Sequence, residues 1–508
     1  MNQEIKIRSA LISVYYKEGL APIIHKLNEA GVTIYSTGGT FDFIESLGVK
    51  ANTVESLTAY PSILGGRVKT LHPKVFGGIL GRRALASDIA EMEQYGIPPF
   101  DLVIVDLYPF EATLASGATH AEIIEKIDIG GISLIRAAAK NYNDVVVVPS
   151  VDYYPELMDL LTTGNCATSV EDRLKFASFG FAVSSHYDAA IFNYMGSLTG
   201  IQEFRYSAKE ANVLRYGENP HQQGIFYGNL HEVFEQLHGK ELSYNNLLDL
   251  DAAVGLISEF SETTFAILKH NNACGVASRP LLTDAWKDAL AGDPVSAYGG
   301  VLVTNAIVDA EVAAEINLLF FEIILAPGYE KNALELLKSK KNRIILQSKS
   351  FDFQPKQFRT VLNGVLLQDK DLKTETAAHL KVVTWHSPDA AIEQDLLFAN
   401  ILVKHSKSNA IVLAKGKQLL GSGAGQTSRV DALKHAIEKA GHFGLDLHGA
   451  VMASDAFFPF ADSVELAHKA GIISVIQPGG SIRDEDTIGY CNANGLSMVF
   501  TGVRHFRH

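Results

Sequence analysis

A cation, an imidazole and two amides directly follow an apolar run in the middle of the chain. The run Phe265-Ala266-Ile267-Leu268 is typical of a buried strand, and Lys269-His270-Asn271-Asn272 comes next. Such groups cost free energy to bury unless they are paired, but at a strand end they reach the crevice where α/β proteins bind ligands. There Lys269 could stabilise a developing oxyanion, and His270 could move a proton near neutral pH. The alternative is a Lys-His pair in a solvated turn.

A glycine-containing loop near the N-terminus predicts an anion site. Ser36-Thr37-Gly38-Gly39-Thr40 lies between a strand-like and a helix-like segment. Backbone amides and hydroxyl groups would therefore meet at a helix N-terminus, which favours phosphate. Ser13 and Lys17 follow the first apolar run and would approach the same anion. The alternative is a plain helix cap, where Thr-Gly-Gly also occurs.

Further polar residues predict acid–base chemistry beside that anion. The segment 65–74 carries two glycines before its charges and a proline after them, so we expect a shaped loop that presents Arg67 and Lys69 inward. A solvated basic loop is the alternative. Tyr108 follows a strand-like run, and Asp128 precedes a helix that it could merely cap. The candidate acid–base residues are Lys69, Tyr108, Asp128 and Lys140.

A parallel sheet covered by helices would position these N-terminal residues. Short apolar runs suit strands buried on both faces, and helix-like segments lie between them. The expected strands are 11–14, 32–35, 102–105 and 145–148, and the expected helices are 41–47, 132–140 and 174–194. The pattern changes near residue 200, so we expect two α/β regions, 1–200 and 201–508.

In the second region, two of the expected strands end in polar clusters. Its expected strands lie near residues 266, 301, 382, 411, 451 and 472. The clusters are Leu268-Lys269-His270 and Met452-Ala453-Ser454-Asp455. This similarity indicates an internally duplicated unit, although no clean sequence period accompanies it.

Composition excludes several classes of protein. A chain of 508 residues with 47% hydrophobic and 20% charged residues predicts a globular protein of several domains. Its net charge of −13 disfavours nucleic acid as a partner. The absence of an apolar run of roughly 18 residues disfavours a membrane, and the N-terminus lacks the pattern of a signal peptide. We therefore expect a cytoplasmic protein.

Neither a metal nor a nicotinamide cofactor is expected. The three cysteines, Cys166, Cys274 and Cys491, lie far apart and form no Cys-x-x-Cys pair, which argues against a disulfide framework and structural zinc. The segment Gly421-Ser422-Gly423-Ala424-Gly425-Gln426 lacks the spacing of a dinucleotide-binding loop. We interpret it as a tight turn beside a ligand, with Arg429 one helical turn further on.

Taken together, these motifs resemble one known family. The chain is similar to the bifunctional purine-biosynthesis proteins that join AICAR transformylase to IMP cyclohydrolase, and the similarity covers nearly the whole chain in the same order. The matching segments are 36–40, 66–73, 128–131, 136–141, 214–221, 268–270, 408–410, 423–426 and 454–460.

The resemblance implies a fold and two activities. It implies an N-terminal methylglyoxal-synthase-like domain acting as cyclohydrolase, and a C-terminal transformylase region built from duplicated cytidine-deaminase-like units. It implies 10-formyltetrahydrofolate as co-substrate, AICAR and FAICAR as ligands, and a homodimer. Deaminases of that fold hold zinc through a Cys-x-x-Cys pair, which this chain lacks, so Lys/His chemistry is expected instead.

The resemblance also implies roles for individual residues. Lys269 and His270 would serve formyl transfer with help from the amide of Asn409. Asp462 would contact folate. The remaining substrate-binding residues expected from the motifs and the resemblance are Ser13, Lys17, Ser36, Thr37, Gly38, Gly39, Thr40, Arg67, Thr70, Arg215, Tyr216, Asn246, Arg429, Asp455, Phe457, Arg504 and Phe506.

Two departures from the family pattern leave alternatives open. Relatives usually read Ser-Val-Ser-Asp-Lys where this chain has Ser13-Val14-Tyr15-Tyr16-Lys17, so a phenol replaces a serine contact. Asn271-Asn272-Ala273-Cys274-Gly275 lacks a proline common in relatives, which predicts a more mobile loop. The alternatives are a transformylase with an impaired cyclohydrolase, a methylglyoxal-synthase-type lyase, and a nucleotide-binding regulator without catalysis. For the lyase, we find no catalytic aspartate arrangement.

Overall fold

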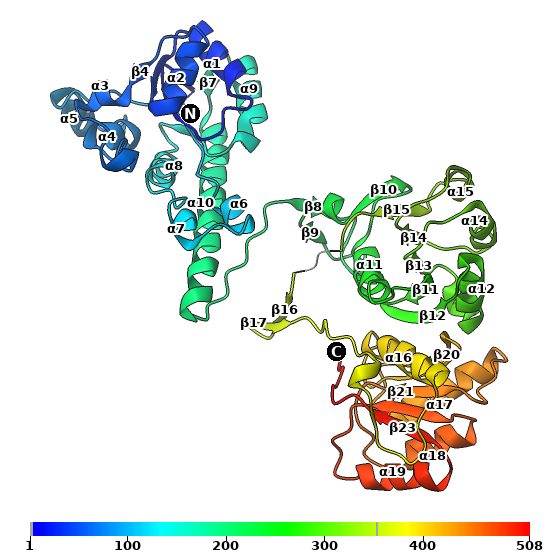
Figure 1. Ribbon diagram of the computed structural model, residues 1–508. Coiled ribbons are helices and arrows are strands. Elements are labelled where there is room, and N and C mark those ends of the chain that lie inside the picture. The colour runs from blue at the N-terminus through cyan, green and yellow to red at the C-terminus, as the bar shows by residue number, and fades with distance from the viewer. Residues whose placement is uncertain (1–3, 352–353) are drawn as a thin grey trace. The chain divides into compact units, whose positions relative to one another are not determined.

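The chain divides into two compact units, which are described separately. A computed structural model describes residues 4–351 and 354–508 (Figure 1). The first unit ends at Lys209 and the second begins at Glu210. The division lies shortly after a long helix, α10 (Val170–Thr199), whose first turn is closed by a capping box between Ser169 and Asp172.

The first unit is built on a parallel five-stranded sheet. The strand order is β4-β3-β2-β5-β6, and all four neighbouring pairs are parallel. Its strands are β2 (Ser9–Ser13), β3 (Thr33–Ser36), β4 (Asn52–Thr53), β5 (Leu102–Val105) and β6 (Val146–Val148), and β1 (Ile5–Lys6) pairs with β7 (Ala167–Thr168) outside the sheet. β3 and β4 follow β2 on one side of the sheet, whereas β5 and β6 lie on its other side. The strand order therefore changes direction between β2 and β5, and α/β proteins bind ligands at such a switch point.

Helices cover both faces of this sheet because its strands are apolar on both sides. One core joins Ile12, Ile34 and Ile104 to α1 and α9, and the other joins Leu11, Val103 and α8. The helices besides α10 are α1 (Leu20–Glu29), α2 (Gly38–Ser46), α3 (Val54–Thr58), α4 (Pro73–Leu80), α5 (Ala86–Gln94), α6 (Phe110–Ala115), α7 (His120–Ile124), α8 (Gly130–Lys140) and α9 (Tyr154–Thr163). The parallel sheet predicted from the four apolar runs is confirmed.

The second unit contains a mixed sheet of twelve strands. Their order is β10-β15-β14-β13-β11-β12-β20-β19-β21-β22-β23-β18. The strands are β10 (Phe234–His238), β11 (Thr264–Lys269), β12 (Asn272–Ser278), β13 (Val301–Thr304), β14 (Ile323–Ala326), β15 (Ile344–Ser348), β18 (Lys381–Val382), β19 (Ile411–Lys415), β20 (Gln418–Gly423), β21 (Val451–Ser454), β22 (Ser474–Gln477) and β23 (Ser497–Phe500). Two hairpins, β8 (Ala211–Val213) with β9 (Ile225–Tyr227) and β16 (Lys356–Val361) with β17 (Gly364–Asp369), lie outside it.

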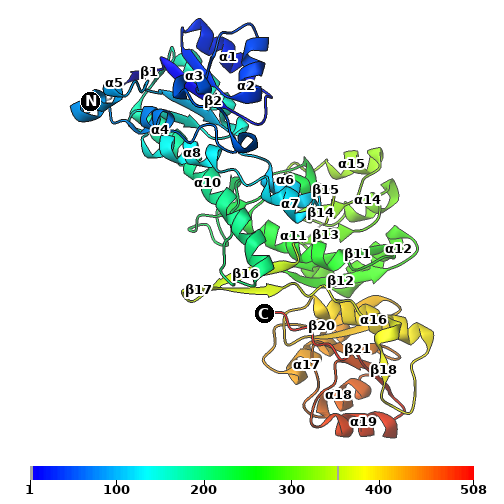
Figure 2. The same ribbon diagram turned by 60° about the vertical axis from the view of Figure 1, so that its left-hand side comes forward.

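The order of strands is duplicated about the centre of the sheet, where β12 pairs with β20. Figure 2 labels these two strands, β12 in the green half and β20 in the half that follows it in the chain. The antiparallel hairpin β11–β12 is followed outward by β13, β14 and β15, just as β19–β20 is followed by β21, β22 and β23. In each half the first outward pair is antiparallel and the next two pairs are parallel. The internal duplication expected from the polar strand ends is therefore present in the topology.

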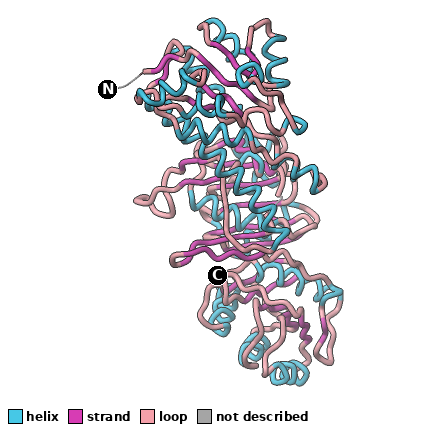
Figure 3. The backbone as a smooth tube through the Cα atoms, turned by 90° about the vertical axis from the view of Figure 1, so that its left-hand side faces the viewer, coloured by secondary structure: helices cyan, strands magenta, loops and turns pink. Residues whose placement is uncertain are grey.

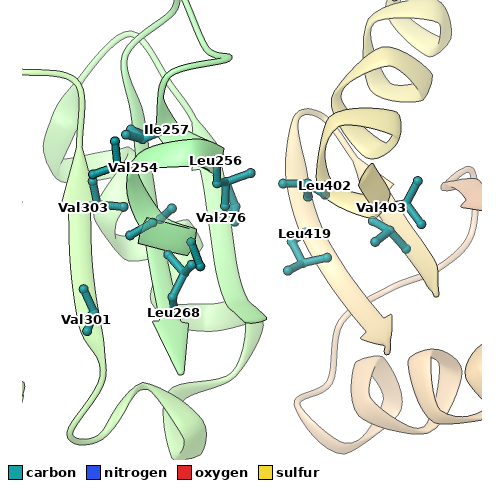
Figure 4. Close-up of a cluster of buried hydrophobic side chains, with 14 of the residues drawn as sticks. Val254, Leu256, Ile257, Leu268, Val276, Val301, Val303, Leu402, Val403 and Leu419 are labelled. Atoms are coloured by element: carbon teal, nitrogen blue, oxygen red, sulfur yellow. The ribbon is translucent and has the colours of Figure 1, made fainter. Parts of the chain in front are cut away.

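Helices flank the duplicated sheet in a matching way (Figure 3). One face packs on α11 (Tyr244–Ile257) and α16 (Ala390–Lys404), and their side chains form one core that includes Leu256, Leu268 and Leu402 (Figure 4). The opposite face packs on α12 (Leu282–Gly292), α14 (Ala310–Ile316) and α15 (Lys331–Leu337) in one half, and on α17 (Arg429–His442), α18 (Asp462–Lys469) and α19 (Asp484–Ala493) in the other. A short helix, α13 (Pro294–Ala297), precedes β13.

The three cysteines are unpaired and buried. Cys166 lies in the first unit, Cys274 on β12 and Cys491 on α19. Burial raises the pKa of the Cys274 and Cys491 thiols to about 12. Within the described residues, none of the helices has the length and apolarity needed to span a bilayer.

Candidate active sites

In the first unit, the predicted anion loop lies at the carboxyl ends of β2 and β3. The Ser13 and Thr37 hydroxyl groups are 3.0 Å apart. Ser36 donates to the Ile12 carbonyl at 2.7 Å and is fully buried, and Thr40 donates to the Val14 carbonyl at 2.9 Å. Ser36 and Thr40 therefore join the loop to β2, which leaves Ser13 and Thr37 as the hydroxyl groups at the mouth of the loop.

The N-terminus of α2 carries no side-chain cap, although Thr37 occupies the capping position. Gly38 and Gly39 are its first two residues, so their amides face the place where an anion would bind. Lys69 reaches the same place, because its ammonium nitrogen lies 3.6 Å from an ideal Cβ position on Gly38. The loop of Lys69 needs glycine as well, since Gly66 has a φ of 90°, a conformation that residues with a side chain rarely adopt.

Asp128 and Tyr108 lie together at the start of α8. Asp128 is buried and accepts a hydrogen bond from the Gly131 amide at 2.6 Å. Burial raises the pKa of its carboxyl group, although the amides of Gly131, Tyr108 and Ile132 oppose that change. Burial and the Asp128 charge raise the pKa of the Tyr108 phenol. Tyr108 therefore remains a proton donor at neutral pH.

Two basic side chains predicted near Asp128 and Tyr108, those of Lys140 and Arg67, do not point into this group of residues. Lys140 is the last residue of α8 and is exposed. Asp128 precedes the first residue of the same helix, whose length of about 15 Å separates them. α8 returns from the carboxyl end of β5 to the amino end of β6, so Lys140 lies at the opposite edge of the sheet. Arg67 forms an ion pair with Glu125 and is largely exposed.

Tyr15 and Tyr16 form the turn after β2 and are held by Asp106. The Asp106 carboxylate accepts hydrogen bonds from both of their backbone amides, the second at 2.9 Å. The Tyr15 ring makes an edge contact with Tyr108 at 5.6 Å between centroids. Lys17 turns back onto its own loop and donates to the carbonyls of Val14 and Tyr15. Tyr15 is thus a wall of the candidate site beside Tyr108.

Thr70 is buried near the start of α8. Its hydroxyl oxygen lies 3.3 Å from an ideal Cβ position on Gly130. The side chains brought together in the first unit are therefore Ser13, Thr37, Lys69, Thr70, Tyr108 and Asp128, on separate loops at the carboxyl edge of the sheet.

In the second unit, Lys269 and His270 lie at the tip of the hairpin β11–β12. Lys269 pairs with Asn272 across the hairpin, so His270 and Asn271 form a two-residue turn. Both have positive φ angles, 50° for His270 and 63° for Asn271. A two-residue hairpin turn with positive φ at both central residues is of type I′. The predicted mobile loop after His270 is wrong, because Asn272–Ser278 forms strand β12 and pairs with β11, with one register shift at Cys274.

Two cavities meet at this turn. One has a volume of about 600 Å³ and is lined by Lys269 and His270 together with Cys274, Ser422 and Gln426. The other has a volume of about 560 Å³ and again includes Lys269 and His270, with Arg215, Tyr216 and Asn246. The Lys269 ammonium group donates to the Tyr298 carbonyl in the second cavity. A proton carrier and a cation are therefore accessible from two binding spaces.

Asn246, one of the predicted ligand-binding residues that line the second cavity, also stabilises the fold. It closes the N-terminus of α11 in a capping box with Ser243, and its amide donates to Glu322 at 3.0 Å. Arg215 lies over the ring of Tyr216, with its guanidinium carbon 5.5 Å from the ring centroid. Arg215 and Lys240 contribute positive charge to the lining of this cavity, where Lys240 lies 3.8 Å from the Glu322 carboxylate.

Asn409 lies next to the first cavity but its donors are occupied. The side-chain amide donates to the carbonyls of Gln426 at 3.0 Å and Thr427 at 3.2 Å. The Ser408–Asn409 peptide bond is cis. For this amide to help formyl transfer by donating a hydrogen bond to a substrate, one of these two carbonyls would have to be released first.

The other predicted binding residues form a separate cluster in the second half of the sheet. Arg429 pairs with the buried Asp455 at 2.9 Å and donates to Ser454. Arg429 and Arg504 lie over the Phe506 ring, at 5.7 and 4.4 Å from its centroid. Phe457 is partly exposed, and Asp462 is the first residue of α18. Of the segment 421–426, interpreted from the sequence as a tight turn beside a ligand, residues 421–423 belong to strand β20, where Gly421 and Gly423 allow close packing of α17. The chain leaves the strand after Gly423, Gly425 has a φ of 67°, and Ala424 and Gln426 line the first cavity.

Comparison with known proteins identifies the family. The model of the AICARFT/IMPCHase bienzyme family matches residues 138–439, and the model of the MGS-like domain matches residues 19–133. The chain is 64% identical to the bifunctional purine biosynthesis protein PurH of Bacteroides thetaiotaomicron over the full length of both chains. The chain belongs to the AICARFT/IMPCHase bienzyme family.

Relatives of the family extend over the same length. The PurH protein of Aquifex aeolicus is 47% identical and matches 98% of this chain and 100% of its own. A solved structure, titled crystal structure of ForH, is 34% identical, covers 37% of this chain and 97% of its own, and has a TM-score of 0.33. The family resemblance and the methylglyoxal-synthase-like N-terminal domain that it implies are confirmed, whereas likeness of the C-terminal region to cytidine deaminases stays a prediction.

Sequence reasoning missed residues that shape both bienzyme sites. Asp106 holds the Tyr15–Tyr16 turn, and Asp249 accepts a hydrogen bond from the Asn271 amide at 2.7 Å. Tyr298 contributes its carbonyl to Lys269. Asp106 could have been found as an acid directly after a buried strand, but nothing in the sequence links Asp249 to the turn. No group of three or more His, Cys, Asp or Glu side chains within the described ranges is arranged to hold a metal ion.

Proposed function

We propose that the chain catalyses the two reactions for which its family is named. A formyl group passes from 10-formyltetrahydrofolate to the amine of AICAR, and the product FAICAR then closes its second ring with loss of water to give IMP. The observation that carries the first reaction is the Lys269–His270 turn, which two cavities share. A transfer between two bound molecules needs such a meeting point.

Formyl transfer is assigned to Lys269 and His270. The amine nitrogen of AICAR attacks the formyl carbon, and His270 accepts the proton that this nitrogen loses. Lys269 stabilises the oxyanion of the tetrahedral adduct, an effect worth roughly 10²- to 10³-fold in rate. The bond from the formyl carbon to N10 of the folate then breaks, and a proton passes to N10. Asn409 is assigned an accessory role, because its amide is bound to Gln426 and Thr427.

Ring closure is assigned to the N-terminal unit. Binding of the nucleotide phosphate is supported by the uncapped N-terminus of α2, with Ser13 and Thr37 beside it. The carboxamide nitrogen attacks the formyl carbon, and water leaves. Lys69 polarises the formyl oxygen, Tyr108 donates a proton to it, and Asp128 accepts one from the attacking nitrogen. Asp128 then returns this proton to the hydroxyl group of the adduct, the C–O bond breaks to release water, and the former amine nitrogen gives its proton back to Tyr108. Lys140 has no part in this assignment, since it lies at the other edge of the sheet.

Nucleotide binding in the second unit is assigned to the cavity that holds Arg215 and Tyr216. Its cations Arg215 and Lys240 offer charge to a phosphate. The cluster of Arg429, Arg504 and Phe506 offers a ring and guanidinium groups to the second substrate or to the same nucleotide. Asp462 stays assigned to folate on the family resemblance alone.

We also propose that the chain acts as a homodimer in the cytoplasm. The hairpin β16–β17 supports a dimer, because both of its strands are exposed along their whole length and carry apolar side chains. Leu366 is 58% exposed and Leu367 is 50% exposed. A second copy of the chain would remove these side chains from water.

One assay tests the proposed function. Purified protein is given AICAR and 10-formyltetrahydrofolate, and release of tetrahydrofolate and of IMP is followed together. We expect both products, with Lys269→Ala abolishing folate release while still converting added FAICAR to IMP. Folate release without IMP would leave a transformylase alone. A folded protein that binds AICAR but releases neither product would be a regulator and would contradict the proposal.

A further inference from the structure

The turn that carries His270 has a counterpart in the other half of the sheet. The hairpin β19–β20 closes through Gly416 and Lys417, because Lys415 pairs with Gln418. Gly416 and Lys417 have φ angles of 57° and 53°, close to those of His270 and Asn271. Both hairpins also carry a register shift at the same distance from the turn, between Ile267 and Leu268 and between Leu413 and Ala414.

An aspartate holds each of these turns from the adjacent helix. In the second half, the Asp395 carboxylate accepts hydrogen bonds from the Gly416 amide at 2.6 Å and the Lys417 amide at 2.7 Å. In the first half, Asp249 accepts from the Asn271 amide at 2.7 Å. Asp249 precedes Asn271 by 22 residues, and Asp395 precedes Lys417 by the same 22 residues. The two aspartates are equivalent residues of α11 and α16.

The turn of the first half needs this support more than its counterpart does. Glycine adopts a positive φ without strain, but His270 and Asn271 are both non-glycine residues in that region. A residue in a sparsely populated conformation persists only where its surroundings hold it. Asp249 supplies that constraint from a helix packed on β11, so the direction of the His270 side chain depends on it.

We propose that Asp249 is a positioning residue for formyl transfer, which holds His270 toward the two cavities by binding the Asn271 amide. This inference rests on the proposed function and extends it to a residue outside the reacting groups. The matching contact of Asp395 has a structural task only, because its turn carries a glycine in place of the histidine. The duplication thus supplies an internal control for the effect of losing such a contact.

Three variants separate positioning from folding. Asp249→Ala removes the acceptor, Asp249→Asn keeps an oxygen that can accept from the same amide, and Asp395→Ala removes the equivalent acceptor in the other half. For each, we would measure kcat for tetrahydrofolate release, the Kd of AICAR, and ring closure of added FAICAR. Ring closure resides in the first unit and reports the folding of that unit only, whereas binding of AICAR reports the folding of the second unit, which contains Asp249 and Asp395.

The expected result is a selective loss of turnover. Asp249→Ala should lower kcat by roughly ten- to a hundredfold, since small misplacement of a reacting group costs up to about 10²-fold. Its Kd for AICAR should be unchanged or lower, because the substitution removes a negative charge from a cavity that binds a phosphate. For Asp249→Asn and Asp395→Ala, kcat for tetrahydrofolate release should stay within about threefold of the wild-type value.

Other outcomes would overturn the proposal. An Asp249→Ala protein with wild-type kcat would show that the turn needs no such support. Equal losses in Asp249→Ala and Asp395→Ala would indicate a general folding effect, and failure of Asp249→Asn to restore kcat would indicate that the charge acts, not the hydrogen bond. A wild-type protein without folate release would instead contradict the proposed function itself.

Discussion

The ammonium nitrogen of Lys69 lies 3.6 Å from the point where a Cβ atom would stand on Gly38. A basic side chain from one loop is thereby brought to the first amides of α2, which carries no side-chain cap. The positive end of a helix and a lysine act on the same small region, and an anionic or oxyanionic group placed there gains from both.

Replacing Lys69 by alanine should therefore abolish ring closure and spare formyl transfer. We expect FAICAR to accumulate from AICAR and 10-formyltetrahydrofolate, with ring closure at least about 10²-fold slower because one oxyanion donor is lost. Chromatography of the reaction mixture would detect FAICAR. Lys50→Ala, at an exposed position of the same unit, is the matched control. Normal IMP production by Lys69→Ala would refute the role of this lysine.

The phenol of Tyr108 is expected to matter for chemistry and little for stability. Tyr108→Phe keeps the ring that contacts Tyr15 edge-on and removes only the hydroxyl group, whose pKa is raised by burial and by Asp128. Ring closure should slow by roughly 10²- to 10⁴-fold, the usual contribution of a proton donor. Tyr15→Phe removes a hydroxyl from the neighbouring ring and serves as control. Equal slowing by both substitutions would contradict the assignment of Tyr108.

A buried histidine should make the stability of the second unit depend on pH. Burial opposes the charged form of His505, but hydrogen bonds to Asp371 at 2.6 Å and Glu375 at 3.0 Å outweigh it and raise its pKa to about 9. Because this value lies above the unfolded one of 6.5, the stabilisation is complete below pH 6.5 and is lost as the pH rises toward 9.

Urea unfolding of wild type and His505→Gln at pH 6 and pH 9 would measure this contribution. The wild-type free energy of unfolding should fall by on the order of 2–3 kcal/mol more than that of the variant. Binding of AICAR measured in parallel would report on Arg504 and Phe506, which flank this histidine. An identical pH dependence in both proteins would show that the ion pairs contribute nothing to stability.

Two equivalent glycines should be intolerant of a side chain. A Cβ on Gly275 would lie 1.9 Å from the Ala289 carbonyl of α12, and a Cβ on Gly421 would lie 2.2 Å from the Ala436 carbonyl of α17. Each alanine substitution should destabilise the second unit by at least about 1–3 kcal/mol, the usual cost of overpacking. Urea unfolding would measure it.

Gly489 provides the control for those substitutions. It lies within α19, and an added Cβ would meet no atom within 4 Å. Gly489→Ala should therefore stabilise the helix by roughly 0.5–1 kcal/mol. A destabilised Gly489→Ala protein, or unchanged Gly275→Ala and Gly421→Ala proteins, would contradict this account of the close helix packing.

The sequence alone indicated the sheets better than it indicated the sites. Four apolar runs predicted four strands of the first sheet, because a strand buried on both faces has an almost continuous apolar sequence. The turn residues Lys269 and His270 stood out for the converse reason, since polar groups follow an apolar strand. Both signals are local and need no knowledge of which elements pack together.

Residue positions that depend on how the elements pack together could not be predicted from the sequence. The sequence groups Lys140 with Asp128 as candidate acid–base residues, yet the helix between them carries Lys140 to the other edge of the sheet. Asp249 was missed because its partner is an amide 22 residues away in sequence. The glycines of segment 421–426 predict a turn, whereas Gly421 belongs to strand β20 and its lack of a side chain allows α17 to pack closely.

The three buried cysteine thiols are intrinsic probes of local unfolding. One lies in the first unit and one in each half of the duplicated sheet, and all are buried. Only the thiolate reacts with alkylating reagents, and a thiol with a pKa of about 12 is ionised to about one part in 10⁵ at pH 7. Iodoacetamide would therefore modify Cys491, which is fully buried, only after local opening of the second half, and peptide mass spectrometry would follow that opening without any engineered probe. Cys274 lines the first cavity and can be reached from it, so its modification would report on access to that cavity.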